Sequence, residues 1–284
     1  MLRRVLAALA LLTPTALMAQ TDKDAIIITG VVDAVGGGGG SQKRGEKTWT
    51  SSVHLVAWRE GIGPIRTETL RVEIPDQREG TLSKWEAVFP PRTLVRFAIR
   101  APLREQNGRM LAILQAPLPR IADAALIAAA DPLLNPPPLD DPEFGIFTPD
   151  RQFPDWLRQR RDWLGHEINV TLQLDYEGAP APDARQRALA HLRKLWEQRA
   201  HWDARLRETI VADYYDTWRD NWRYENEPEI DREAFKARFI LEDASVSPGG
   251  SLTFTFADDD LFWGHAMAVH YDPDTGELYA EMFG

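Results

Sequence analysis

The first half of the chain alternates apolar and polar residues with the period expected of β-strands. Within 67–74, for example, Leu70, Val72 and Ile74 would share one face of a strand. Five segments of this kind, separated by turn-forming residues, lie at 25–35, 48–58, 67–74, 94–100 and 110–116. Region 24–120 is therefore predicted to be an all-β domain, either a small barrel or a sandwich.

The spacings between these strands add two expectations. The stretch 77–89 is long enough for a helix, and five strands with an insertion at that point resemble the layout of the oligonucleotide/oligosaccharide-binding (OB) barrel. Five glycines, Gly36–Gly40, predict a mobile loop between the first two strands. A phosphate-binding loop would end in Gly-Lys-Ser/Thr before a helix, whereas Lys43-Arg44-Gly45 and a strand follow here.

A proline-rich segment, 121–142, separates the two halves of the chain. Its five prolines, from Pro132 to Pro142, argue against continuous regular structure. The segment is predicted to be a semi-rigid, extended linker with one or two helical turns at 124–130.

Region 143–284 combines helical and strand periodicities. Helices are predicted at 153–163, 183–199, 203–222 and 231–239, and strands at 168–176, 240–246, 251–257, 261–271 and 277–282. Asp183 stands where a carboxylate accepts from the free amides of a first helical turn. The chain is therefore predicted to be α+β, with a small five-stranded OB-like barrel followed by a domain of helices packed on an antiparallel sheet.

The first residues have the pattern of a secretory signal. Arg3 and Arg4 precede an apolar run, 5–19, that ends at Ala19 before polar residues. This run is shorter than the roughly 20 residues that span a bilayer. We expect cleavage of 1–19 after Ala19, a periplasmic or secreted protein, and no stable membrane insertion after cleavage.

The net charge of the chain changes sign near residue 120, where the strand-type pattern of the first half also ends. Residues 22–120 carry a net charge of +4, whereas 121–284 carry 16 Lys or Arg against 32 Asp or Glu. A chain this acidic is not expected to bind nucleic acid. It has no cysteine, so its stability comes from packing without disulfides, and thiol chemistry is excluded.

The last segment carries a distinctive motif, Leu261-Phe262-Trp263-Gly264-His265, after an acidic turn. This motif resembles the end of a bacterial family of unknown function, DUF2262. The likeness extends back to about Glu143 and includes Trp163-x-Gly165 and the Trp-rich paired helices. The resemblance implies a fold shared with that family and supplies no mechanism.

Asp258, Asp260 and His265 are the candidate catalytic residues, because carboxylates and an imidazole together bind divalent metals or transfer protons. If 261–271 is one strand, His265 shares an apolar face with Leu261 and Trp263. It is then a core histidine bonded to a buried carbonyl or carboxylate, and the aspartates form a hairpin turn. No metal site and no cofactor is predicted.

Trp263, His265, Trp218 and Trp222 are the candidate binding residues. The chain has ten tryptophans, and large aromatic side chains line ligand grooves when they are exposed. At helical spacing, however, tryptophans more often form the core. Exposure therefore decides between the two interpretations.

Without a catalytic motif, the sequence favours a non-enzymatic exported module that binds a protein or a small ligand. Two alternatives stay open. One is a metal-assisted hydrolase using 258–265. The other is an acidic inhibitor or immunity-type protein whose C-terminal domain blocks a basic partner.

Overall fold

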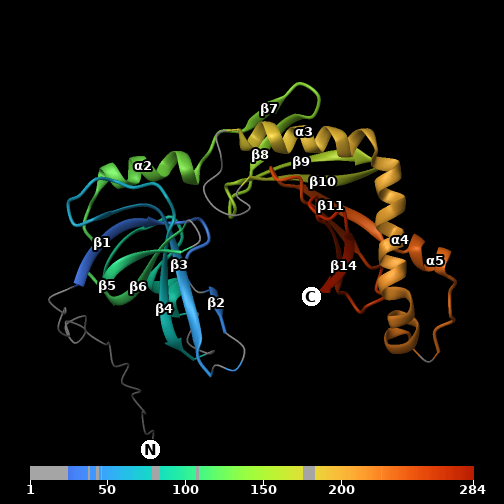
Figure 1. The fold of residues 1–284 in the computed structure, drawn as a ribbon, viewed down its shortest axis with the longest axis horizontal. Helices are drawn as coiled ribbons and strands as arrows, with labels where there is room; N and C mark the ends of the chain where they lie inside the picture. Colours follow the sequence, from blue (N-terminus) through green and yellow to red (C-terminus); the bar gives the residue numbers. More distant parts are fainter. Residues whose placement is uncertain are drawn as a thin grey trace, which may run out of the picture. The chain divides into compact units, whose positions relative to one another are not determined.

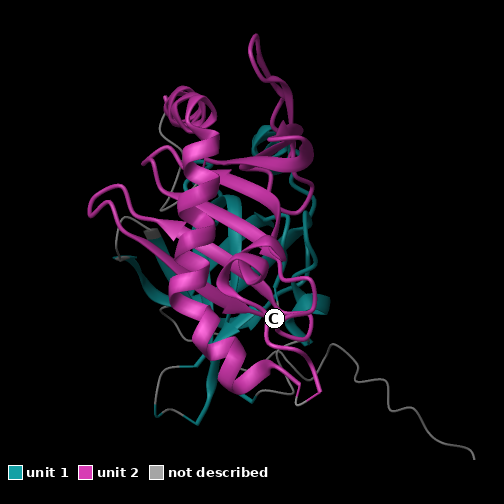
Figure 2. Ribbon diagram, turned by 90° about the vertical axis from the view of Figure 1, so that its right-hand side faces the viewer, with its two compact units in different colours: residues 1–134 teal, residues 135–284 magenta. Residues whose placement is uncertain are grey.

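The computed structural model describes residues 25–37, 39–42, 45, 47–78, 84–106, 109–174, 183–224 and 226–284. The predicted signal at 1–19 lies outside them. The chain divides into two compact units, Met1–Leu134 and Asn135–Gly284 (Figures 1 and 2). The structure mixes helices and strands and is dominated by its sheets. Among the described residues, no helix is both long and apolar enough to cross a membrane.

The N-terminal unit is built on one sheet with the strand order β1-β5-β6-β4-β3-β2. Its elements are β1 (Ala25–Val32), β2 (Gly39–Ser41), β3 (Trp49–Glu60), β4 (Leu70–Gln77), α1 (Lys84–Val88), β5 (Leu94–Gln106), β6 (Arg109–Pro117) and α2 (Ala124–Leu134). β1 also pairs with β3, so the series of pairings returns to its first strand. Alternate side chains of these strands form one core around the buried rings of Trp58, Phe89 and Phe97. All five predicted strands are present, and the predicted insertion holds α1.

The glycine run is not a free loop where it is described. The amide of Gly37 donates to the carbonyl of Phe89 at 2.9 Å, and a Cβ on Gly37 would lie 2.9 Å from the carbonyl oxygen of Trp85. Gly39–Ser41 form β2, which pairs with β3. Gly37 permits close approach of two backbone segments, and the predicted loop is replaced by the strand β2 at Gly39 and Gly40.

The proline-rich segment 121–142 contains more regular structure than an extended linker. α2 continues through Pro132, and its buried side packs on β1 and β3. The Asp123 carboxylate accepts the amide of Leu126 at 3.2 Å and pairs with Arg59. Burial of one helix face and this cap offset the helical hydrogen bond lost at Pro132.

The C-terminal unit is an eight-stranded sheet with the order β14-β13-β12-β11-β10-β9-β8-β7 and helices against one face (Figure 1). Its strands are β7 (Leu139–Asp141), β8 (Gly145–Pro149), β9 (Trp156–Trp163), β10 (His166–Gln173), β11 (Ile240–Val246), β12 (Leu252–Ala257), β13 (Ala266–Tyr271) and β14 (Leu278–Phe283). Its helices are α3 (Ala184–Glu197), α4 (Arg199–Thr217), a π-helical turn η3 (Trp218–Trp222) and α5 (Arg232–Ala237).

One pair of strands departs from the expected antiparallel sheet. β10 and β11 are parallel, whereas the other neighbours in this sheet are antiparallel. The helices α3, α4 and α5 connect these two strands in the sequence, and parallel neighbours require a crossover of this kind. The expectation of an antiparallel sheet was wrong at this pair.

Two further expectations fail locally. The predicted helix 153–163 is the strand β9, because residue-by-residue pairing with β10 keeps its backbone extended. Asp183 precedes α3 but makes no side-chain cap. Its carboxylate pairs with Arg187 at 3.3 Å instead.

Candidate functional site

The turn between β12 and β13 is organised by one buried carboxylate. Asp258 accepts the amide of Asp260 at 3.2 Å with one oxygen and the amide of Phe262 at 2.6 Å with the other. Asp259, Asp260 and Trp263 adopt positive φ angles of 47°, 65° and 57°. Non-glycine residues in this region cost free energy, and such strain gathers at functional sites.

This turn replaces the first part of the predicted strand 261–271, so alternation does not hold there. Leu261 and Phe262 both point into the core, whereas 51% of the surface of Trp263 is exposed. The expectation that Leu261, Trp263 and His265 share one apolar face was therefore wrong. The strand begins only at Ala266.

Trp263 lies in an aromatic patch, which we define as Trp222, Tyr224, Trp263 and His265. The ring centroids of Trp263 and Tyr224 are 5.5 Å apart and nearly parallel, at 25°. Trp222 contacts Trp263 at 4.9 Å and His265 at 5.2 Å. The π-helical turn η3 supplies Trp222 at the end of α4, and π-helical turns are frequent at functional sites.

The other candidates from the sequence separate in the structure. His265 is half-buried, and its Nδ1 lies 2.6 Å from the carbonyl oxygen of Phe262. The predicted hydrogen bond to a carbonyl is therefore present, but His265 lies at the edge of the core. Trp218 is fully buried beside Tyr215 and Phe235 and is not part of the patch. Sequence reasoning missed Tyr224, whose place beside Trp263 depends on the chain leaving η3.

The acidic residues of this turn have structural partners. Both oxygens of Asp258 accept backbone amides, and Asp259 pairs with Arg238. Asp260 is exposed beside them. Across the described ranges, no group of three His, Asp or Glu residues is placed to hold a metal ion.

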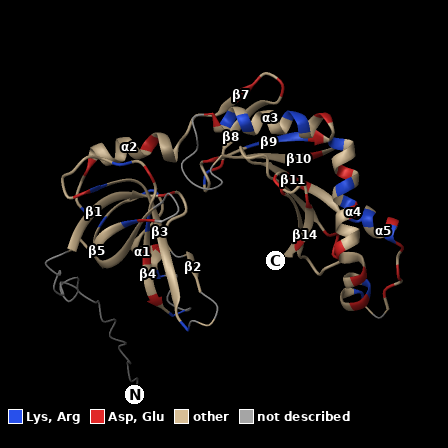
Figure 3. Cartoon of the chain, in the orientation of Figure 1, with Lys and Arg blue, Asp and Glu red and all other residues tan. Residues whose placement is uncertain are grey.

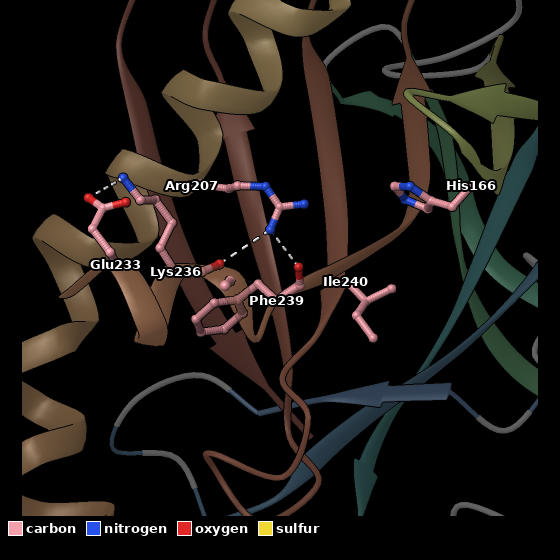
Figure 4. Close-up of a pocket in the computed structure, with 7 residues that line it drawn as sticks. His166, Arg207, Glu233, Lys236, Phe239 and Ile240 are labelled. Atoms are coloured by element: carbon pink, nitrogen blue, oxygen red, sulfur yellow. Dashed lines mark hydrogen bonds and ion pairs between the residues drawn. The ribbon is translucent and has the colours of Figure 1, made fainter. Parts of the chain in front are cut away.

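A groove of about 580 Å³ lies between α4, α5 and the starts of β10 and β11 (Figure 4). Arg207 in its wall donates to the carbonyl of Phe239 at 2.6 Å and to Asp203 at 2.8 Å. Lys236 pairs with Glu233 at 2.8 Å. Both cations already bond to groups of this unit. These bonds stabilise the packing of α4 and α5, and the groove therefore offers little positive charge to a ligand.

A polar cluster that the sequence did not reveal lies on the face of the sheet opposite the helices, which we call the helix-free face. Asp243 accepts the hydroxyls of Ser245 at 2.7 Å and Thr171 at 2.8 Å. Burial raises the pKa of Asp243, against the opposing effects of these hydroxyls and of Arg158. Its orientation depends on a β-bulge after Leu241, which periodicity alone does not indicate.

The end of the chain carries acidic residues and no basic ones. Residues 239–284 contain nine Asp or Glu and no Lys or Arg, and the strands β11 and β14 carry red and no blue in Figure 3. A surface of one sign attracts partners of the opposite sign.

Both halves of the chain match families of uncharacterized bacterial proteins or domains. The family of uncharacterized proteins conserved in bacteria, DUF2262, matches residues 141–282, and the chain belongs to this family. A second domain of unknown function, DUF7021, matches residues 14–131. No curated protein and no solved structure matches the chain significantly. The resemblance drawn from the Leu261–His265 motif is confirmed.

Proposed function

We propose that this chain is a non-enzymatic binding protein whose aromatic patch contacts a partner protein. The observation that carries the proposal is Trp263, which is 51% exposed and sits at a positive φ angle of 57°. The backbone strain offsets much of the stability that the half-exposed indole gains from its two ring contacts. Its position is therefore better explained by an interaction with another molecule.

The patch fits a protein better than a sugar. A sugar ring stacks on an open aromatic face, whereas one face of Trp263 is covered by Tyr224. The two rings form a compact apolar surface of the kind that acts as a hot spot in protein interfaces, where Trp and Tyr are enriched. The net charge of −16 over 121–284 further favours a partner with basic residues around the contact.

Selection of a phage-displayed library of 12-residue peptides on the mature protein, residues 20–284, tests this proposal. Peptides rich in Lys or Arg and in apolar residues are expected to bind. Trp263→Ala should weaken them about thirtyfold, as loss of a hot-spot residue does. Ile146→Ala is the matched control, because Ile146 is 60% exposed in the same unit and lies outside the patch.

Two outcomes would contradict the proposal. Selected peptides could bind Trp263→Ala as tightly as the wild type, in which case the patch is not the contact. Alternatively, a glycan array could give ligands that require Trp263 while peptides fail, in which case the partner is not a protein.

An acidic inhibitor or immunity-type protein is a special case of the same proposal. The absence of Lys and Arg from 239–284 favours a basic partner, as an enzyme with a basic active-site cleft would be. The metal-assisted hydrolase has less support, since Asp258 is used by backbone amides. Inhibition of such an enzyme by the purified protein, lost in Trp263→Ala, would distinguish an inhibitor from a simple adaptor.

We also propose that the protein acts after export, as the pattern of 1–19 indicates. Intact-mass measurement on protein from the periplasmic fraction should give a chain beginning at Gln20. A full-length chain in the cytoplasm would contradict this.

For the N-terminal unit, we propose a closed OB-type barrel. The support is the circuit of pairings β1–β3–β4–β6–β5–β1, in which only β4 and β6 are parallel. An experimental structure in which β1 pairs with only one of β3 and β5 would contradict a closed barrel.

A further inference from the structure

The chain repeatedly places an arginine on an aromatic ring and pairs the same guanidinium with a carboxylate. The guanidinium carbon of Arg232, for example, lies 4.6 Å from the ring centroid of Tyr215, and its Nη2 lies 3.3 Å from Asp216 Oδ2. Such triplets include Arg66–Trp58–Glu68, Arg158–Trp156–Asp150, Arg207–Phe256–Asp203 and Arg232–Tyr215–Asp216. The ring face attracts the cation while the carboxylate accepts its N–H groups.

The helix-free face presents a ring and a carboxylate of the same kind on β14. Tyr279 is paired with His270 of β13, and their rings stack at 5.0 Å and 26°. His270 is held by Thr253, whose Oγ1 lies 3.2 Å from Nδ1, and by Glu281, whose Oε2 lies 3.6 Å from Nε2. The imidazole therefore supports Tyr279 as a fixed platform.

The opposite side of this platform is open to solvent. Tyr279 is 52% exposed, and the side chain of Glu281 is 65% exposed. The two residues are two positions apart on one strand, so their side chains lie on the same face. The surrounding segment 239–284 has no Lys or Arg, so a cation that joins them comes from outside this segment.

We propose that Tyr279, His270 and Glu281 form a docking point for an arginine side chain of a partner polypeptide. The guanidinium lies flat on Tyr279 and directs N–H groups to the Glu281 carboxylate. Lysine fits less well, because its ammonium is strongly hydrated and has no planar face to stack. Phosphate-bearing and acidic ligands are disfavoured by the carboxylates of this segment.

This inference adds a chemical requirement to the partner under the proposed function. It uses residues that are all outside the aromatic patch. Loss of binding at Trp263 and loss of binding at Tyr279 can therefore be measured separately, and either proposal can fail alone.

The test is an NMR titration of the mature protein, residues 20–284, with the peptide Gly-Gly-Arg-Gly-Gly, whose two ends are chemically blocked. Its lysine and citrulline analogues are titrated in parallel. We expect saturable shifts of the Tyr279 ring and Glu281 side-chain signals with the arginine peptide. Smaller shifts are expected with lysine and none with citrulline, which keeps the shape but lacks the charge. Tyr279→Ala and Glu281→Gln should each weaken binding about twofold to fivefold, the range for an exposed cation–π or ion-pair contact.

Two variants serve as controls. Tyr279→Phe keeps the ring and should retain binding, and Ile146→Ala, at an exposed position of the same unit outside both sites, should leave it unchanged. The proposal is overturned if citrulline shifts the same signals as strongly. It is also overturned if Tyr279→Ala and Glu281→Gln bind like the wild type. Should Tyr279→Ala lose its native amide spectrum, Glu281→Gln decides the question, because its side chain is exposed.

Discussion

Phe262 and Trp263 are sequence neighbours whose surroundings differ in a way that mutation can measure. Phe262 is fully buried against Tyr214, Trp222 and Phe235. Phe262→Ala should therefore lower the free energy of unfolding by about 3–5 kcal/mol. Trp263→Gly loses two ring contacts of about 0.5–1.5 kcal/mol each but relieves a positive φ angle that costs about 1–2 kcal/mol.

The net loss for Trp263→Gly should be under about 2 kcal/mol, because relief of the backbone strain offsets much of the lost ring packing. Urea unfolding of both variants checks the contrast. A loss in Trp263→Gly as large as in Phe262→Ala would mean that Trp263 supports the fold, and the argument for a binding role would fail.

The sequence identified this segment but not its geometry. The Leu261–His265 motif indicated the correct family and contains two of the patch residues, Trp263 and His265, and the tryptophan count added a third, Trp222. The strand alternation assumed for 261–271 placed His265 in the core, because periodicity has no information about a turn closed by Asp258. Tyr224 carries no motif and joins the patch only through tertiary packing.

At the scale of elements, the buried carboxyl of Asp243 makes the sheet sensitive to pH. Burial raises the pKa of this group above its ordinary value of 3.8, so the folded state favours the protonated form. The stability that protonation of Asp243 confers is present at low pH and is lost as the pH rises through the pKa of Asp243 in the folded state. Asp243→Asn should therefore be more stable than the wild type near neutral pH, and the difference should narrow toward pH 4.

Thermal melts across this pH range measure the difference for Asp243→Asn. Asp274→Asn is the matched control, because Asp274 is exposed on the loop before β14, and it should show no such trend. A wild type that is more stable than Asp243→Asn at neutral pH would mean that the hydroxyl bonds to the carboxylate outweigh its burial.

Elements with a regular period were the ones that the sequence predicted well. The strands of the N-terminal unit and the helices α3 and α4 follow their patterns. β9 does not, because Trp156, Arg160 and Trp163 have helical spacing while its backbone is fixed by pairing with β10. The parallel pair β10–β11 was also missed, since partner choice depends on the crossover and leaves no local signal.

For the whole molecule, the separation of the cores predicts two unfolding events. The clusters around Phe97 and around Ala130 lie entirely within the N-terminal unit, and the cluster around Phe254 lies entirely within the C-terminal unit. Cooperativity arises from shared packing, and each cluster is assembled from residues of one unit. Calorimetry of the mature chain should therefore show two transitions.

The variants Phe97→Ala and Phe254→Ala test this assignment. Each should lower the free energy of unfolding of its own unit by about 3–5 kcal/mol, and each should lower the melting temperature of a different transition by several degrees. If either variant moves both transitions together, the units stabilise each other, and ligand effects measured on one unit could not be assigned to that unit alone.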